Sequence, residues 1–519
     1  MENKNAASLA APAPDMKLFY ACFVALVTTA FGFVLRAVVL PQWGRDFNLT
    51  QSELGQISGV GLWPFAISIV LFSMIIDKIG YKTAMIFAFI CHVSSAVVTI
   101  MADGYWMLYI GTFIMALGNG IVEAVVNPVV ATVFHKQKIK WLSILHAGWA
   151  GGLVLGGIMA MILGEETPWE YTVALLLLPT ILYAVMTISR RFPVNERVQA
   201  GVTYKEMLQE VGAGGALLVT GLIIFQLGAV FGWPLEINIA VTLILTAIFG
   251  WYTRSFGRPL LIILLLLMIP LATTELGTDS WITDLMTPAM REIGLQGGWV
   301  LVYTSAIMFV LRFFAGPIVH KISPLGLLAV SSLVAALGLY MLSFSTGVMI
   351  LLAATIYGLG KTFFWPTMLG VVAERFPKGG ALTLNITGGL GMIAAGVIGA
   401  GILGFIQDRS IEKGVLRYDQ ANNTQIHEQY VTDTKTSLFG EYKGIDQEKL
   451  ETASDQEKQT VSAIRENSKK TALRDIVIFP LIMFASYLAL IFYFRSKGGY
   501  KAVSLTTENP DKATVNNTL

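Results

Sequence analysis

The stretch GNGIVEAVVNP, residues 118–128, places Glu123 inside a long apolar run. This run, 105–134, is long enough to cross a bilayer as a helix, and Glu123 falls in its middle turns. An ionisable side chain at that depth costs about 3 kcal/mol, so such groups usually face a bundle interior or an aqueous path. Asn127 and Pro128 follow within about one turn and add an amide and a helix break near the same face. The pattern predicts a transport pathway.

The composition is that of a membrane protein. The chain has 519 residues, of which 55% are hydrophobic and 13% charged, and its mean hydropathy is +0.65. Both cysteines lie inside apolar runs, so no disulfide framework is expected. The sequence therefore predicts an all-α polytopic membrane protein of about fourteen helices. The predicted spans are 17–40, 56–76, 82–101, 105–134, 142–164, 168–189, 214–232, 236–252, 259–284, 299–320, 324–345, 348–373, 381–406 and 473–495.

These spans form two six-helix blocks with additional segments. The predicted units are an N-terminal tail (1–16), a six-helix bundle (17–190), a linker (191–213), an inserted helix pair (214–258), a second bundle (259–495) and a C-terminal tail (496–519). The second bundle is interrupted by a polar insertion, 407–472, in which 22 of 66 residues are charged. Its composition favours a solvated lobe or lid without a site of its own, and its last part is expected to be helical.

The loops predict an orientation. The short loops assigned to one side carry fourteen Lys and Arg residues, whereas those on the other side carry only Arg45 and Arg291. Because basic loops stay in the cytoplasm, both termini are expected there and the insertion outside, in a cell (inner or plasma) membrane.

An internal repeat relates the two blocks. TTAFG at 28–32 in the first span matches TTELG at 273–277 in the first span of the second block. In the fourth span of each block, three residues match at a constant offset of 238: Gly120, Glu123 and Pro128 match Gly358, Lys361 and Pro366. Parallel halves of this kind are typical of large secondary transporters, whose substrate site lies near the midplane between them.

Several local patterns resemble those of one transporter family. The fourth span carries a glutamate followed by Asn-Pro, the first ends in Pro-Gln, and the seventh core span carries a glutamate, a glycine and a Ser-aromatic pair. The residues are Glu123, Asn127 and Pro128; Pro41 and Gln42; and Glu275, Gly277, Ser280 and Trp281. They resemble the major facilitator superfamily and, within it, the branch of fucose and glucose–galactose proton symporters. The resemblance implies the major facilitator fold, with two pseudo-symmetric six-helix bundles, and proton-coupled sugar uptake.

The loop after the second span is also similar to that of the superfamily. It reads Asp77-Lys-Ile-Gly80-Tyr-Lys82, so Asp77, Gly80 and Lys82 are expected to form a gating loop. The chain departs from the sugar branch in three respects. Arg36 and its neighbour stand near the outer end of the first span, where the fucose transporters have an essential acid. The central helix pair and the polar insertion are additions to the family pattern.

Charged side chains inside the spans are the first candidates for chemistry. Glu123 is the candidate for proton coupling, because a buried carboxyl can hold a proton and release it when the cavity opens to the other side. The alternative is that Glu123 pairs permanently with a base and braces the bundle. The repeat places Lys361 across the cavity at similar depth, where the two could pair. Whether such a pair breaks during transport is left open.

Four further charges lie within the spans. Glu275 and Asp279 are one turn apart on the same helix face, and Glu275 is the nearer to the midplane. Arg36 and Arg312 balance the acids, which favours a structural network of ion pairs. The alternative is recognition of an anionic substrate, for which the guanidinium fork is suited.

Aromatic and amide side chains complete the predicted site. Rings pack on the C–H faces of sugars and amides bind hydroxyls, so both are suited to a sugar site. The predicted lining residues are Asn119, Asn127, His146, Trp149, Glu275, Trp281, Trp365 and Asn385, and Glu275 could contact substrate hydroxyls or a cation. The alternatives are ordinary packing for the tryptophans, hydrogen bonds between helices for the asparagines and a core position for the histidine.

The leading functional prediction is a secondary active transporter that couples uptake of a monosaccharide or similar polyol to protons. No nucleotide-binding loop, metal-ligand cluster or nucleophile constellation occurs in the sequence, so neither an enzyme nor a cofactor or metal is predicted. The expected partners are a small substrate, a coupling ion and the lipid bilayer, without nucleic acid, and the chain is expected to be a monomer. The alternatives are sodium coupling, organic-anion transport through the buried bases, and a non-transporting nutrient sensor.

Overall fold

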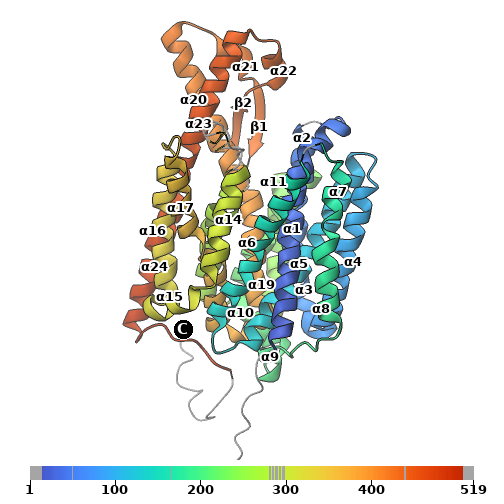
Figure 1. Ribbon diagram of the computed structural model, residues 1–519. Coiled ribbons are helices and arrows are strands. Elements are labelled where there is room, and N and C mark those ends of the chain that lie inside the picture. Colours follow the sequence, from blue (N-terminus) through green and yellow to red (C-terminus); the bar gives the residue numbers. More distant parts are fainter. Residues whose placement is uncertain are drawn as a thin grey trace, which may run out of the picture.

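The computed structural model describes residues 15–49, 51–164, 166–279, 282, 286, 290, 294, 298–437 and 440–505. In these residues the chain is a bundle of long helices with a small lobe at one end (Figure 1). Twelve helices in the described ranges are long and apolar enough to cross a membrane. A pair of shorter helices, bent by 68° at its break, makes a thirteenth span. The predicted all-α membrane fold is therefore confirmed, with 12 or 13 spans by this criterion.

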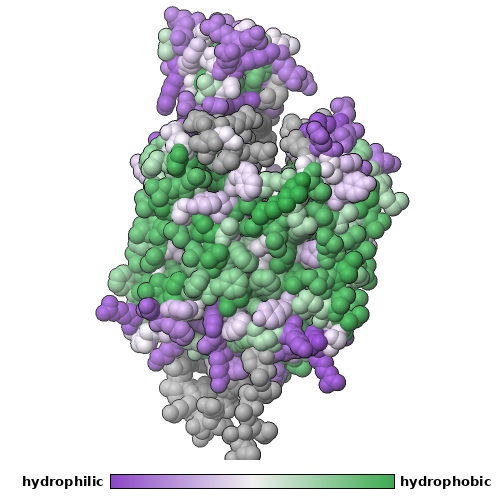
Figure 2. Space-filling view, viewed as in Figure 1, coloured by the Kyte–Doolittle hydropathy of each residue, from purple (hydrophilic) through white to green (hydrophobic). Residues whose placement is uncertain are grey.

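The outer surface has the polarity expected of a membrane protein. Figure 2 shows a broad apolar band around the bundle, with polar residues on the lobe above it and on the opposite end below it. We call the first end the lobe end and the second, where α1 begins and α24 ends, the terminal end. An apolar band of this kind is what the hydrocarbon core of a bilayer requires.

The first half of the bundle contains the helices that precede the linker. Long apolar stretches favour helix here, since a helix satisfies backbone groups within lipid, and α1 and α5 continue past the interior prolines Pro41 and Pro128. Glycine supports one sharp turn: Gly80 ends α3 at a φ of 82°, a left-handed value that favours glycine. The elements are α1 (Met16–Asp46), α2 (Gln51–Gly59), α3 (Trp63–Ile79), α4 (Tyr81–Ile100), α5 (Tyr105–Val133), α6 (Lys138–Leu163), α7 (Trp169–Ala174) and α8 (Leu177–Ile188).

The second half repeats this arrangement with two local distortions. Single π-helical turns, η1 and η3, interrupt its first and fifth spans and pack on each other through Gly277 and Gly399. The predicted span 381–406 is helical throughout, as α19, η3 and the start of α20. The elements are α12 (Pro259–Ala272), η1 (Thr273–Gly277), α14 (Gly298–Arg312), α15 (Ala315–Ile322), α16 (Pro324–Leu342), α17 (Met349–Lys361), α18 (Phe364–Arg375), α19 (Gly380–Ala394), η3 (Ala395–Gly399), α20 (Ala400–Asn422) and α24 (Ile478–Ser496).

A helix pair, α10 (Tyr204–Phe231) and α11 (Leu235–Thr253), lies between the halves in sequence. Helix α10 begins with a capping box formed by Thr203 and Glu206, inside the segment predicted as linker. It continues across a kink at Gly212, whose φ is 55°. A side chain there would collide with the backbone of Gly257, so the kink and the close approach both require glycine.

The polar insertion folds as a lobe with its own core. It contains the outer part of α20, then α21 (Ile426–Tyr430), the antiparallel strands β1 (Asp433–Ser437) and β2 (Gly440–Gly444), α22 (Gln447–Glu451) and α23 (Asp455–Ile476). Apolar side chains gather between these elements: Ile411, Val415, Ile426, Val431, Ile445, Leu450, Ala453 and Val461. This strand pair is a local exception to the all-α class. The sequence analysis did not predict it, because its residues show no clear alternation of apolar and polar side chains.

The linker is fastened to the terminal end of the bundle. Its short helix α9 (Glu196–Gln199) places Arg197 against Asp77 at the end of α3, at a distance of 2.5 Å between Nη2 and Oδ2. The guanidinium also donates to the backbone oxygen of Val202. Next to it, Asn195 donates to the hydroxyl of Tyr81. The predicted gating loop is thus held by the linker at this end.

We expect Arg197→Ala to lower the stability of the folded protein. The side chains of Arg197 and Asp77 are 5% and 12% exposed, and removing one partner of a buried pair costs about 3 kcal/mol or more. The apparent melting temperature in detergent should fall clearly. Lys449→Ala, which breaks an exposed pair with Asp446 in the lobe, is the control and should change it little. Equal effects of the two variants would contradict a stabilising role for the buried Arg197–Asp77 pair.

Candidate functional site

The central cavity lies between the two halves. It encloses about 280 Å³ of empty space. From the first half come residues of α5 and α6, and from the second residues of η1, α14, α18 and α19. The lining residues are Glu123, His146, Trp149, Glu275, Leu276, Arg312, Trp365 and Met392. Six of these eight are predicted site residues, and the sequence reasoning missed Leu276 and Met392, whose apolar side chains carry no signal in an apolar helix.

Glu123 enters this cavity without a basic partner in the described part of the chain. Helix α5 is buried on nearly all sides, and Gly120 lets it approach the backbone of Phe65 in α3. The carboxylate accepts a 2.5 Å hydrogen bond from the amide of Asn127, one turn later. The oxygen of that amide lies 3.1 Å from Nε2 of His146 and accepts a hydrogen bond from it. A polar chain therefore runs from α6 through Asn127 to Glu123.

Arg312, from the second half, lines the same cavity. Its Nη2 lies 2.9 Å from Oε1 of Glu275, and the two side chains are 2% and 3% exposed. The other carboxylate oxygen of Glu275 accepts from the backbone N–H of Trp365 at 3.2 Å. This acid is thus bound on both oxygens, unlike Glu123, whose ion-pair partner is absent among the described residues. The two carboxyls of the cavity have different environments.

Lys361 and Asp279 form a second buried ion pair beside the cavity. The ammonium group is fully buried and also lies 5.0 Å from the centroid of the Tyr357 ring. The Tyr357 hydroxyl donates to the backbone oxygen of Thr274 in η1. The possibility that Lys361 pairs with Glu123 is therefore not realised in this structure, and the lysine neutralises an acid of its own half.

The remaining predicted residues lie elsewhere. Asn119 lies 3.1 Å from His92, which in turn contacts the hydroxyl of Tyr183, so this amide belongs to a network within the first half. Asn385 donates to the backbone oxygen of Ala124 across the two halves. Arg36 is half-buried with its guanidinium over the Phe33 ring, at 5.3 Å. Trp281 lies outside the described residues.

His92 and Tyr183 form a buried polar pair that the sequence reasoning did not single out. A histidine in the middle of the apolar run of α4 was the available signal, since an unpaired imidazole is costly there. Gly118 leaves room for this ring against α5. In the described ranges no group of three or more His, Cys, Asp or Glu residues is arranged to hold a metal ion.

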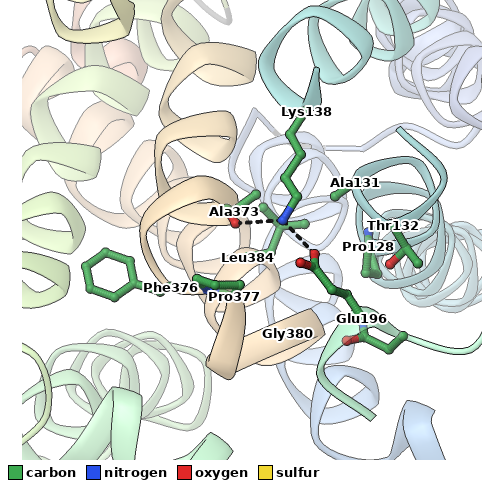
Figure 3. Close-up of a pocket in the computed structure, with 11 residues that line it drawn as sticks. Pro128, Ala131, Thr132, Lys138, Glu196, Ala373, Phe376, Pro377, Gly380 and Leu384 are labelled. Atoms are coloured by element: carbon green, nitrogen blue, oxygen red, sulfur yellow. Dashed lines mark hydrogen bonds and ion pairs between the residues drawn. The ribbon is translucent and has the colours of Figure 1, made fainter. Parts of the chain in front are cut away.

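A second cavity lies toward the terminal end and is shown in Figure 3. It has about 290 Å³ of empty space between α5, α6, α18, α19 and the linker. Lys138 points into it and lies 2.6 Å from Glu196 of the linker. The same ammonium donates to the backbone oxygen of Ala373, in the other half, at 3.2 Å. Lys138 therefore joins the first half, the linker and the second half at this end.

Comparison with known proteins identifies the family. The sequence profile of the Major Facilitator Superfamily matches residues 22–396, so the chain belongs to that superfamily. Among curated relatives, the chain is 29% identical over 182 residues to the class B tetracycline resistance protein of Escherichia coli, covering 34% of this chain and 45% of that protein. It is 20% identical over 198 residues to the gentisate transporter of Corynebacterium glutamicum, covering 37% and 44%. The chain thus spans about half the length of these relatives.

Solved structures share the fold over almost the whole chain. The human organic anion transporter MFSD10 (TETRAN) aligns with a TM-score of 0.61 and 12% identity, over 91% of this chain and 99% of that one. The proton:xylose symporter XylE of E. coli aligns with a TM-score of 0.60 and 12% identity, over 94% and 98%. The E. coli fucose:proton symporter FucP aligns with a TM-score of 0.54 and 14% identity, over 90% and 98%. At these identities the likeness concerns the fold alone.

The contribution of the Lys361–Asp279 ion pair to stability can be tested with a single and a double variant. Lys361→Met should leave an uncompensated buried carboxylate and cost about 3–5 kcal/mol of stability, whereas Lys361→Met with Asp279→Asn should recover most of that loss. The apparent melting temperature of the purified protein measures both. Lys497→Met, at an exposed position after α24, is the matched control and should be nearly neutral. A double variant as unstable as the single one would contradict the prediction.

Proposed function

We propose that this member of the Major Facilitator Superfamily is a proton-coupled carrier that takes up a monosaccharide or a similar polyol by alternating access. The observation that carries the proposal is the environment of Glu123. This carboxyl faces the cavity between the halves, is 4% exposed, and has an amide as its hydrogen-bond partner in place of a base. Such a group can exist in protonated and ionised forms without breaking an ion pair, which is what a proton carrier needs.

The lining of the cavity supports a neutral, hydroxyl-bearing substrate. Trp149 and Trp365 offer aromatic surfaces from opposite halves, and the polar side chains of Glu123, His146 and Glu275 line the same cavity. This combination of apolar walls with a few directed polar groups is typical of small-molecule sites. Contacts from both halves to one substrate are also what couples its binding to the rocking of the halves.

The buried bases argue against an anionic substrate. The guanidinium of Arg312 is paired with Glu275, and the ammonium of Lys361 is paired with Asp279. An anion would have to displace one of these carboxylates, leaving a buried negative charge without a partner. Sodium coupling at Glu123 or Glu275 is the remaining alternative for the ion, and a sensor that binds without transport is the alternative for the activity.

Import with the lobe outside is part of the proposal, based on the basic loops at the terminal end.

We expect Glu123→Gln to abolish uptake driven by a proton gradient and to retain exchange of labelled for unlabelled substrate. The amide keeps the shape of the carboxyl and its bond to Asn127 but cannot carry a proton across. The measurement is uptake of labelled D-glucose, D-galactose, L-fucose and D-xylose by proteoliposomes with an inward proton gradient, followed by counterflow. Glu451→Gln, on the surface of the lobe, is the control and should behave as the native chain.

Three outcomes would contradict the proposal. Uptake that needs sodium and is lost when choline replaces it would assign the coupling to sodium. Binding of a sugar without counterflow would make the chain a sensor, and gradient-driven uptake that survives in Glu123→Gln would make this carboxyl structural.

A further inference from the structure

We propose that Arg312 is a positioning residue that links the state of Glu275 in the central cavity to the contact between the two halves at the terminal end. The inference rests on the transport function proposed above, since it assigns that function a coupling element. It is carried by the contacts of one buried side chain, which reach both halves at once.

Arg312 has three acceptors in three directions. Its Nη2 is bound to Glu275, as described, and its Nε donates to the backbone oxygen of Thr362 at 2.8 Å. Both of these groups belong to the second half. Its Nη1 donates to the backbone oxygen of His146, on α6 of the first half, at 2.7 Å. The guanidinium is therefore a bridge between the halves, anchored by two bonds on one side and one on the other.

The backbone of Arg312 adds a second bond across the same interface. The hydroxyl of Ser143, also on α6, donates to the backbone oxygen of Arg312 at 3.1 Å. Ser143 lies about one turn from His146, so both contacts join the same part of α6 to the end of α14. Separation of α6 from α14 at the terminal end must break both.

The position of the guanidinium depends on Glu275. Arg312 is 1% exposed, and a charge buried to that degree must be compensated by an opposite charge. Glu123 faces the same cavity and is the other carboxyl available there. When a substrate hydroxyl engages Glu275, the attraction of this carboxylate for Arg312 weakens and the guanidinium turns toward Glu123. The planar fork then loses its alignment with the His146 oxygen, and the terminal end is freed to open.

Two glycines provide reporters at opposite ends of this interface. A Cβ at Gly316 in α15 would lie 3.6 Å from the Cβ of Lys140 in α6, near the terminal end. A Cβ at Gly157 in α6 would lie 3.2 Å from a methyl group of Val302 in α14, toward the lobe end. Gly316→Cys and Gly157→Cys therefore place single thiols in closed contacts, in a background where the buried Cys22 and Cys91 are replaced by alanine.

The experiment measures the rate of maleimide labelling of each thiol in the full-length purified protein, without added sugar. Arg312→Lys keeps the charge beside Glu275, but an ammonium cannot hold three acceptors in the directions of the fork. We expect labelling at position 316 to rise about tenfold, the factor for one charge-assisted hydrogen bond, while labelling at 157 stays the same or falls. Glu275→Gln should act in the same direction. Arg375→Lys, an arginine of the terminal end bound to the backbone of Lys501, is the matched control and should change neither rate.

Two results would overturn the inference. Equal labelling of native and Arg312→Lys proteins at both positions would show that the bridge does not hold the interface. A parallel rise at both positions would show that Arg312 only braces the fold. Transport is scored separately: selective opening at position 316 without uptake of any sugar tested would uphold the positioning role and reject the sugar carrier. Sugar uptake by the native chain, together with unchanged labelling in Arg312→Lys, would uphold the sugar carrier and reject the positioning role.

Discussion

The ion pair between Arg312 and Glu275 lies in the apolar interior of the bundle, where a charge without a partner is most costly. Both side chains are almost fully buried, and each depends on the other because an isolated charge at that depth is far costlier than the pair. The pair fixes η1 against α14, and the remaining donors of the guanidinium fix α14 against α17 and α6. The three hydrogen-bond acceptors of this guanidinium therefore hold the helices around the central cavity in place.

The two halves neutralise their charges differently, although the repeat relates them. Inside the described membrane-spanning helices of the second half, the buried charges pair with each other, as Arg312–Glu275 and Lys361–Asp279. In the first half, Glu123 accepts a hydrogen bond from the amide of Asn127, and this amide is in turn bound to His146. A carboxyl held by neutral donors can gain or lose a proton with little rearrangement, whereas a carboxyl in an ion pair cannot. Under the proposed function, this asymmetry would give proton exchange to the first half and leave the buried charges of the second half balanced.

Sequence reasoning located the depth of these groups better than their partners. Glu123, His146, Trp149, Glu275, Arg312 and Trp365 line the cavity, because position along a span determines depth and the repeat relates the two fourth helices. The partners depend on rotation about each helix axis, which apolar runs do not specify. Thus Lys361, predicted opposite Glu123, turns to Asp279, and Asn119 turns to His92 within its own half. The π turn at η1 adds a further rotation that no periodicity in TTELG indicated.

Among the described residues, three hydrogen bonds between the halves share one kind of acceptor, a backbone carbonyl. Lys138 donates to the oxygen of Ala373, Asn385 to that of Ala124, and Arg312 to that of His146. The residues four positions after Ala124 and Ala373 are Pro128 and Pro377, which have no N–H, so these two carbonyls lack the usual helical donor and the side chains of Asn385 and Lys138 supply one. Breaking either contact therefore leaves a backbone carbonyl without a partner until water or another donor replaces it. Ala124 follows Glu123 of the central cavity, and Asn385 follows Leu384 of the second cavity, so this bond lies between the two. In the proposed carrier, a substrate leaving the central cavity toward the terminal end would pass this point, so opening of the path requires water or another donor to take the place of these side chains.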